Sequence, residues 1–193
     1  ERVGEGNPEQ ATLFSFQQQS RAAAPVSSDE AQSAKLELLT VHPVGHPVII
    51  AYLTEERHIP LELTRRYLNE VTYRNTENGR EYFAFGMENE SGGYEIRVAS
   101  SKLSFKSALK ARDISVVRGT APERGMVNVF EGMTDFLSLL AMMKLDNLAG
   151  DSVILHSLTS FPRAAEHLRS EDYRVINTFL DNDLAGEDGT EKF

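Results

Sequence analysis

Three carboxylates follow two apolar segments of the chain. Glu131 comes directly after residues 126–130, and Asp181 and Asp183 come directly after residues 173–180. Both apolar segments have the composition of buried strands, so the carboxylates are predicted to lie on strand-end loops. Carboxylate oxygens are preferred ligands of Mg²⁺, which usually takes its remaining ligands from water and substrate phosphates. The pattern therefore indicates metal-assisted chemistry on a phosphate group.

The segments between these carboxylates must bring them together. The chain predicts a helix over residues 134–144, a strand over 152–158 and a helix over 162–169. An order of strand, helix, strand, helix, strand is typical of a parallel sheet with crossover helices. Ligands of such sheets bind beyond the carboxyl ends of the strands. We therefore expect the three carboxylates to meet at one sheet edge.

Three further residues are candidates for supporting roles. Gly132 and Gly186 allow tight turns and a close approach of phosphate to the backbone. Asp135 falls in the first turn of the expected helix, either beside the metal or as a favourable charge near the helix N-terminus. The alternative is that these motifs are solvated loops and helix caps, a common use of such residues. Two motifs at strand ends of one unit favour function over that alternative.

Composition excludes several classes of protein. The 193 residues are 40% hydrophobic, which is enough for a core, and contain no cysteine, so neither disulfides nor a thiolate zinc site are expected. No apolar run is long enough to span a membrane. The first ten residues lack the regions of a signal peptide, and the chain begins with Glu1 rather than Met. We expect a cytoplasmic protein that is part of a longer chain.

The net charge of −9 is unevenly distributed. Residues 121–193 hold 6 basic and 13 acidic side chains, which disfavours general nucleic-acid binding there and suits a metal site. Residues 97–118 have the opposite balance, with Asp113 as their one acidic residue. This window contains Arg97, Lys106 and Arg112, and it is where a phosphate backbone is expected to bind.

The chain divides into three parts by composition. Residues 1–35 are rich in Gln, Ser and Ala and are expected to form a flexible arm. Residues 36–120 predict a small α+β subdomain with a first strand, two short helices and an antiparallel meander over residues 70–98. Residues 121–193 predict the α/β unit. His156 falls inside a predicted strand of that unit and is interpreted as a packed or strand-end residue rather than a ligand.

Two segments of the α/β unit resemble a known family. VFEGMTDFLSLL and FLDNDLAG are similar to the two signature motifs of the Toprim domain, which DnaG-type primases, type IA and II topoisomerases and some nucleases share. Upstream, HPVIIAYLTEERHIPLELTRRYLNEVTY and FAFGMENESGGYEIRV resemble segments of primase-like proteins, especially those of Bacteroides-type mobile elements. The resemblance covers residues 36–186. It implies a Toprim-like βαβαβ parallel sheet preceded by a smaller, primase-like α+β subdomain.

The resemblance also implies an activity. It is that of a nucleotidyltransferase that uses Mg²⁺ or Mn²⁺ to make RNA primers on single-stranded DNA from ribonucleoside triphosphates, in replication or transfer of a mobile element. A replicative helicase is a candidate partner. Glu131 would take the acid/base or metal role, and Asp181 and Asp183 would be metal ligands. Gly132, Asp135 and Gly186 match supporting positions, and Arg97, Lys106 and Arg112 match basic residues that meet phosphates.

The chain departs from the family in two respects. Primases usually carry an amino-terminal zinc module, whereas this chain has no cysteine, and the family continues well past the second motif, so a fragment is expected. Two alternatives therefore stay open. One is a Toprim nuclease with the same metal ligands and water as the nucleophile. The other is a non-catalytic nucleic-acid-binding or scaffold module, which the acidic balance also favours.

Overall fold

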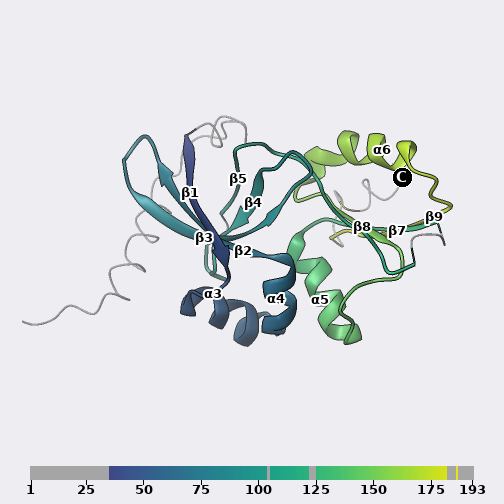
Figure 1. Ribbon diagram of the computed structural model, residues 1–193, viewed down its shortest axis with the longest axis horizontal. Coiled ribbons are helices and arrows are strands. Elements are labelled where there is room, and N and C mark those ends of the chain that lie inside the picture. Colours follow the sequence, from purple (N-terminus) through teal and green to yellow (C-terminus); the bar gives the residue numbers. More distant parts are fainter. Residues whose placement is uncertain (1–34, 104, 122–124, 182–185, 187–193) are drawn as a thin grey trace, which may run out of the picture.

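The computed structural model describes residues 35–103, 105–121, 125–181 and 186, which form two sheets side by side with helices packed against them (Figure 1). This mixed architecture confirms the predicted fold class. The predicted arm, apart from Lys35, and the candidate ligand Asp183 lie outside the described residues.

The first sheet has five antiparallel strands in the order β1-β2-β3-β4-β5. The predicted meander corresponds to β2, β3 and β4. Turns containing Gly79 and Gly92 join these strands, and both glycines have a positive φ, of 68° and 70°. The strands are β1 (Leu36–Pro43), β2 (Asn69–Asn75), β3 (Glu81–Glu88), β4 (Tyr94–Arg97) and β5 (Lys106–Leu109).

Two short helical segments separate β1 from β2. The first is α3 (Pro47–Ala51), which continues directly into the π-helix η1 (Tyr52–Glu56), and the second is α4 (Leu61–Tyr67). The π-helical turn closes where the Arg57 backbone N–H donates to the Tyr52 carbonyl at 3.0 Å, five residues earlier. In α3, Ile49 is fully buried, whereas Val48 is 38% exposed.

The second sheet is mainly parallel and has the order β6-β8-β7-β9. β7 runs parallel to both β8 and β9, and β6 is an antiparallel edge strand. Helix α5 connects β7 to β8 and α6 connects β8 to β9, so the predicted βαβαβ order is confirmed. The elements are β6 (Ser115–Val117), β7 (Met126–Phe130), α5 (Met133–Met143), β8 (Asp151–Ile154), the 3₁₀ turn η3 (Leu158–Ser160), α6 (Phe161–Ser170) and β9 (Val175–Phe179).

Two boundaries differ from the sequence predictions. β6 belongs to the second sheet, so the sheets divide between Leu109 and Ser115 rather than at residue 120. The strand expected over residues 152–158 ends at Ile154, because His156 takes a left-handed conformation with φ 62° and η3 begins at Leu158. His156 therefore lies just beyond a strand end rather than inside a strand.

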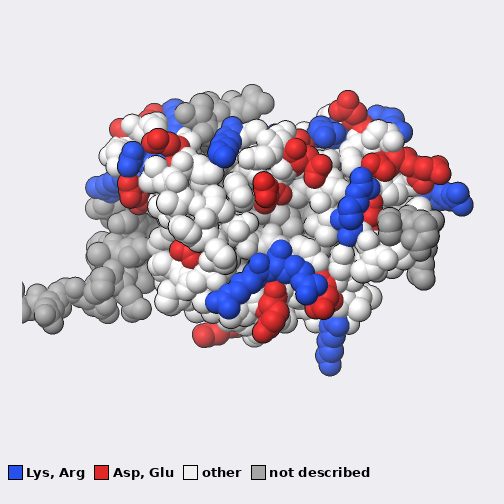
Figure 2. Space-filling view, in the orientation of Figure 1, with Lys and Arg blue, Asp and Glu red and all other residues white. Residues whose placement is uncertain are grey.

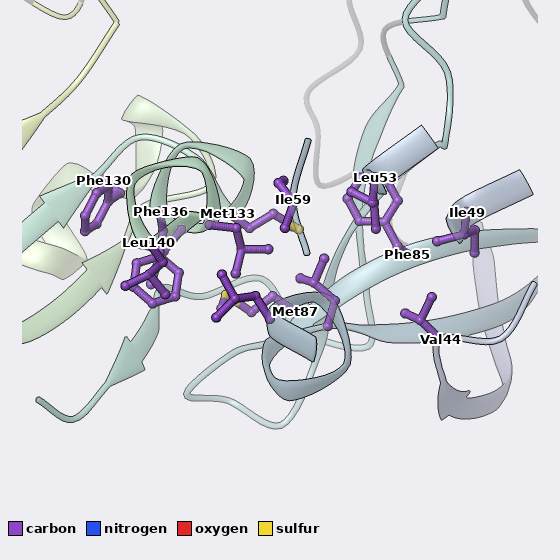
Figure 3. Close-up of a cluster of buried hydrophobic side chains, with 14 of the residues drawn as sticks. Val44, Ile49, Leu53, Ile59, Phe85, Met87, Phe130, Met133, Phe136 and Leu140 are labelled. Atoms are coloured by element: carbon purple, nitrogen blue, oxygen red, sulfur yellow. The ribbon is translucent and has the colours of Figure 1, made fainter. Parts of the chain in front are cut away.

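One hydrophobic cluster joins the two halves of the molecule. α5 contributes Met133, Phe136 and Leu140, which pack with residues of α3, η1 and β3 (Figure 3). The Tyr67 ring meets the edge of Phe136 at 5.1 Å between centroids. Helix α6 lies on the opposite side of the second sheet from α5 (Figure 1). A second hydrophobic cluster packs Ala164 and Leu168 of α6 against that face of the sheet. The second sheet is therefore covered on both faces, as parallel sheets require.

Within the described ranges, no helix has both the length and the apolar character needed to cross a membrane.

Candidate metal and phosphate-binding site

The carboxyl ends of β7 and β9 lie side by side. Phe130 and Phe179 are register partners, and their rings stack at 4.7 Å between centroids. Just beyond them, the Glu131 backbone N–H donates to the Phe179 carbonyl at 3.2 Å. The Asp181 backbone N–H donates to Glu131 Oε2, also at 3.2 Å. Parallel pairing thus brings together two predicted ligands that are 50 residues apart in sequence.

Asp135 and Gly132 form a compact turn at the start of α5. The Asp135 carboxylate accepts a hydrogen bond from the Gly132 backbone N–H, which satisfies one unpaired donor of the helix start. A Cβ at Gly132 would lie 2.8 Å from Asp135 Oδ2, so a side chain there would displace the carboxylate. Glycine at position 132 therefore permits the contact that fixes Asp135.

The environment of Asp135 disfavours its charged form. Its side chain retains access to solvent, but the surrounding protein atoms partly desolvate it, and this raises the pKa of Asp135. The nearby charge of Asp181 raises that pKa further, while the Gly132 N–H and Arg57 oppose the shift. Asp135 and Asp181 therefore repel each other, and a cation between them would relieve that repulsion.

Gly186 packs directly against the backbone of Asp181. A Cβ at position 186 would collide with the carbonyl oxygen of Asp181, so the close approach requires glycine. The contact supports the conformation of the chain at Asp181. Asp183, the third predicted ligand, is not among the described residues.

A cavity of about 560 Å³ lies between the two sheets at these strand ends. The acidic side chains come from α5 and from the strand ends of the second sheet, and the basic ones come from the first sheet, the loop between β4 and β5, and the end of η1. On the molecular face shown in Figure 2, acidic and basic side chains are interspersed instead. The acidic residues that line the cavity are Glu131, Asp135 and Asp181, and the basic ones are Arg57, Arg97, Lys102 and Lys106.

The three predicted basic residues occupy different positions. Arg97 and Lys106 are register partners on β4 and β5, and both line the cavity. Arg112 does not line it and is half-buried. Its charge acts on the buried side chains of Glu95 and His156. The structure thus brings two of the three to the cavity.

Arg57 and His156 line the cavity, although the sequence analysis assigned neither of them to the functional site. Arg57 comes directly after the π-helical turn, and its Nε donates to the Tyr52 hydroxyl at 2.9 Å. A periodic helix pattern assigns Arg57 to a solvated face, and a π-turn has no clear sequence signal. His156 had a signal in its position, because it lies just beyond β8 as Glu131 lies just beyond β7.

His156 is neutral in the folded protein. Burial lowers the pKa of its imidazole to about 3, and the charges of Arg97 and Arg112 act in the same direction. Its Nε2 lies 2.8 Å from the Ser115 hydroxyl, which donates its own proton to the Glu88 carbonyl at 2.6 Å. The hydroxyl must then accept from His156, which fixes the tautomer with the proton on Nε2.

The donor set suits Mg²⁺ held by few protein ligands. Glu131 and Asp181 offer hard oxygen donors at adjacent strand ends, and Asp135 adds negative charge nearby. In the part of the chain that the structure describes, no three acidic or histidine side chains form a complete metal cluster. Mg²⁺ commonly binds through one or two carboxylates plus waters and phosphates, so the site fits this ion.

Comparisons with known proteins agree with this arrangement. Residues 128–193 match the family model described as Toprim-like, and residues 38–107 match a domain of unknown function, DUF8464. No curated protein matches the sequence. The fold is similar to the crystal structure of the primase fragment of the bacteriophage T7 primase-helicase protein, with a TM-score of 0.52 and 13% identity over 91% of this chain and 70% of that one. The family match therefore identifies residues 128–193 as a Toprim-like segment, and the structural comparison shows a fold shared with that primase fragment.

Proposed function

We propose that this protein is a primase-like nucleotidyltransferase that joins ribonucleotides into RNA primers on single-stranded DNA. The observation that carries the proposal is the cavity, which is lined both by carboxylates at two parallel strand ends and by four basic side chains. Such a pairing suits a polyphosphate bound together with a divalent cation. The likeness to a primase fragment supports the same activity.

Each group of residues has a defined part in this proposal. Glu131 and Asp181, with Asp183, would hold Mg²⁺ or Mn²⁺, and that ion would neutralise charge on the phosphates. Arg97 and Lys106 would bind phosphate oxygens from the opposite side of the cavity. The fixed turn at Gly132 would keep the backbone close to the ligand. Most of the rate enhancement would then come from positioning and electrostatics.

The partners belong to the same proposal. They are a single-stranded DNA template, ribonucleoside triphosphates and a replicative helicase, in the replication or transfer of a mobile element in the cytoplasm. The primase-helicase origin of the similar structure supports the helicase as a candidate.

The test combines metal binding with product analysis. Calorimetry with Mn²⁺ should detect binding to the wild type that disappears in Glu131→Gln and Asp181→Ala. Primer synthesis from labelled ribonucleotides on single-stranded DNA should disappear in the same variants. Glu171→Gln is the matched control, because Glu171 is a half-exposed carboxylate that pairs with Arg118 outside the cavity. Unchanged synthesis by Asp181→Ala would contradict the assignment.

The products also separate the two alternatives. Shortened DNA strands without primers would identify a metal-dependent nuclease that uses the same ligands. DNA binding without either product, and without specific Mn²⁺ binding, would identify a non-catalytic nucleic-acid-binding or scaffold module.

A further inference from the structure

One basic residue of the cavity comes from a helical turn rather than from the first sheet or its loops. Arg57 directly follows the π-helix η1, and Tyr52 is the first residue of η1. Both residues line the cavity. In a regular α-helix, side chains that meet on one face are three or four residues apart, whereas this π-helical turn pairs residues five apart. The irregular turn therefore brings positions 52 and 57 together.

Two hydrogen bonds join Arg57 to Tyr52. The Arg57 backbone N–H donates to the Tyr52 carbonyl at 3.0 Å, and Arg57 Nε donates to the Tyr52 hydroxyl at 2.9 Å. The guanidinium carbon also lies 5.5 Å from the centroid of the Tyr52 ring, which is within the range of a cation–π contact. The side chain of Arg57 is thus tied to the same residue at its base and at its guanidinium.

Tyr52 is a fixed anchor for this contact. It is 5% exposed, and its ring stacks against the buried ring of Phe85 at 5.9 Å between centroids. Arg57, in contrast, is exposed. A long exposed side chain loses conformational entropy when it binds a ligand, and restraint before binding reduces that cost. The Tyr52 hydroxyl supplies such a restraint to Arg57.

The contact with Tyr52 occupies only the inner nitrogen of the guanidinium. Among the residues that the structure describes, none accepts a hydrogen bond from the two Nη groups of Arg57. The charge of Arg57 acts on Asp135, where it opposes the rise of the pKa that burial and Asp181 cause. Arg57 therefore lies within electrostatic reach of the carboxylates that line the same cavity.

We propose that Arg57 binds a phosphate group of the nucleotide beside the metal site, and that Tyr52 is a positioning residue that holds the guanidinium of Arg57 through Nε. This inference deepens the proposed function and rests on it, because it assumes a metal-bound polyphosphate in the cavity. An arginine held at Nε presents its two Nη groups as a planar fork for phosphate oxygens. Its charge opposes binding of the metal alone and favours binding of the anion.

Opposite effects on two ligands identify this role of Arg57. Calorimetry measures the binding of Mn²⁺ alone and then the binding of ATP at saturating Mn²⁺. Arg57→Met removes a positive charge near the metal site, so Mn²⁺ alone should bind about twofold more tightly. The same variant lacks the phosphate-binding fork, so ATP should bind about tenfold more weakly. A merely structural role of Arg57 would weaken the binding of both ligands.

A double-mutant cycle tests whether Tyr52 acts through Arg57. Tyr52→Phe keeps the buried ring and removes the hydroxyl that accepts from Nε. It should weaken ATP binding about threefold and leave the binding of Mn²⁺ alone unchanged. In the Arg57→Met background, Tyr52→Phe should have no further effect, because methionine has no N–H group for the hydroxyl to hold.

A matched control and the wild type keep the outcomes separate. Arg66 is half-exposed, pairs with Asp146 at 3.6 Å and lies outside the cavity, so Arg66→Met should leave both affinities unchanged. Unchanged ATP binding by Arg57→Met, equal losses of Mn²⁺ and ATP binding, or equal effects of Tyr52→Phe in both backgrounds would overturn this inference alone. No binding of Mn²⁺ or ATP by the wild type would overturn the proposed function and this inference with it.

Discussion

Carboxylates at the amino ends and at the carboxyl ends of the strands of the second sheet have different environments. At the amino end of β8, Asp151 is 1% exposed and accepts hydrogen bonds at 2.7 Å from the Gly119 N–H, the Arg118 guanidinium and the Tyr173 hydroxyl. At the carboxyl ends of the strands, Asp135 is partly desolvated and lies near Asp181, and the Gly132 N–H and Arg57 only partly oppose the resulting rise of its pKa. Asp151 is thus fully paired within its own half of the structure, whereas Asp135 and Asp181 share an open cavity with basic side chains from outside the second sheet.

The pKa shifts have the signs that this difference predicts. Burial alone would raise the pKa of Asp151, but the hydrogen bonds from Gly119, Tyr173 and Arg118 outweigh it and lower that pKa. The pKa of Asp135 is raised instead. A structural carboxylate is thus recognised by its donors. At Asp135, partial desolvation and the nearby charge of Asp181 outweigh the Gly132 N–H and Arg57, and a bound cation would favour the charged form of this carboxylate.

The largest expected effect on stability is at the amino edge. Asp151→Asn should lower the free energy of unfolding by about 3 kcal/mol, because it removes a charge on which three donors converge and leaves Arg118 without this partner. Urea denaturation measures this loss. Mn²⁺ affinity of the folded variant should stay unchanged, and a large loss of affinity would show that the two edges are not independent.

At the carboxyl end of β8, acid should destabilise the protein through His156. The unfolded imidazole binds a proton below about pH 6.5, whereas the folded one stays neutral until about pH 3. The unfolded chain therefore gains protons first, and the free energy of unfolding should fall by about 2 kcal/mol between about pH 6.5 and pH 5. Arg97 and Arg112 oppose protonation in the folded state.

Replacing His156 by Asn isolates this contribution. Asparagine tolerates the left-handed backbone at this position and does not titrate. The difference between wild type and His156→Asn in denaturation midpoint should therefore depend on pH over this range. If the denaturation midpoints of the two proteins changed by the same amount with pH, the acid sensitivity would belong to groups other than His156.

Mg²⁺ should stabilise the protein by binding at the carboxyl ends of the strands and not at their amino ends. At ten times the dissociation constant, Mg²⁺ should raise the free energy of unfolding by about 1.4 kcal/mol, since it binds the folded chain only. Thermal melts with and without Mg²⁺ measure this gain. Asp181→Ala should lose it and Glu171→Gln should retain it, so an equal gain in both variants would indicate metal binding elsewhere.

The smallest expected effect is a gain in stability. Without metal, Asp135→Asn should raise the free energy of unfolding by about 0.5 kcal/mol, because it removes the repulsion from Asp181 while the amide oxygen still accepts from Gly132. The same variant should bind Mg²⁺ more weakly. A loss of stability in the metal-free variant would mean that the capping hydrogen bond outweighs the repulsion.

Much of the α/β unit was predictable from the sequence, because the hydrophobic patterns that indicate its strands and helices are local. The apolar run 126–130 and the helix after it appear where periodicity indicated, and the two sheet edges result from the βαβαβ order. The strand boundary at Ile154 was not predictable, because an apolar run does not reveal the left-handed turn at His156. The candidate metal ligands Glu131 and Asp181 came from their positions after strands, and the structure brings these two together.

The sequence by itself determined the succession of strands and helices along the α/β unit and the acidic character of its strand ends, because hydrophobic periodicity and residue chemistry are local properties of the chain. Only the tertiary structure decided which groups face those carboxylates. Arg57 comes from a π-helical turn and Arg97 from another sheet, and the hydrophobic cluster shared with α5 brings their halves of the chain together. The hydrogen bond from Arg97 to the carbonyl of His156 has the same origin, since contacts between residues 59 positions apart depend on packing rather than on local pattern.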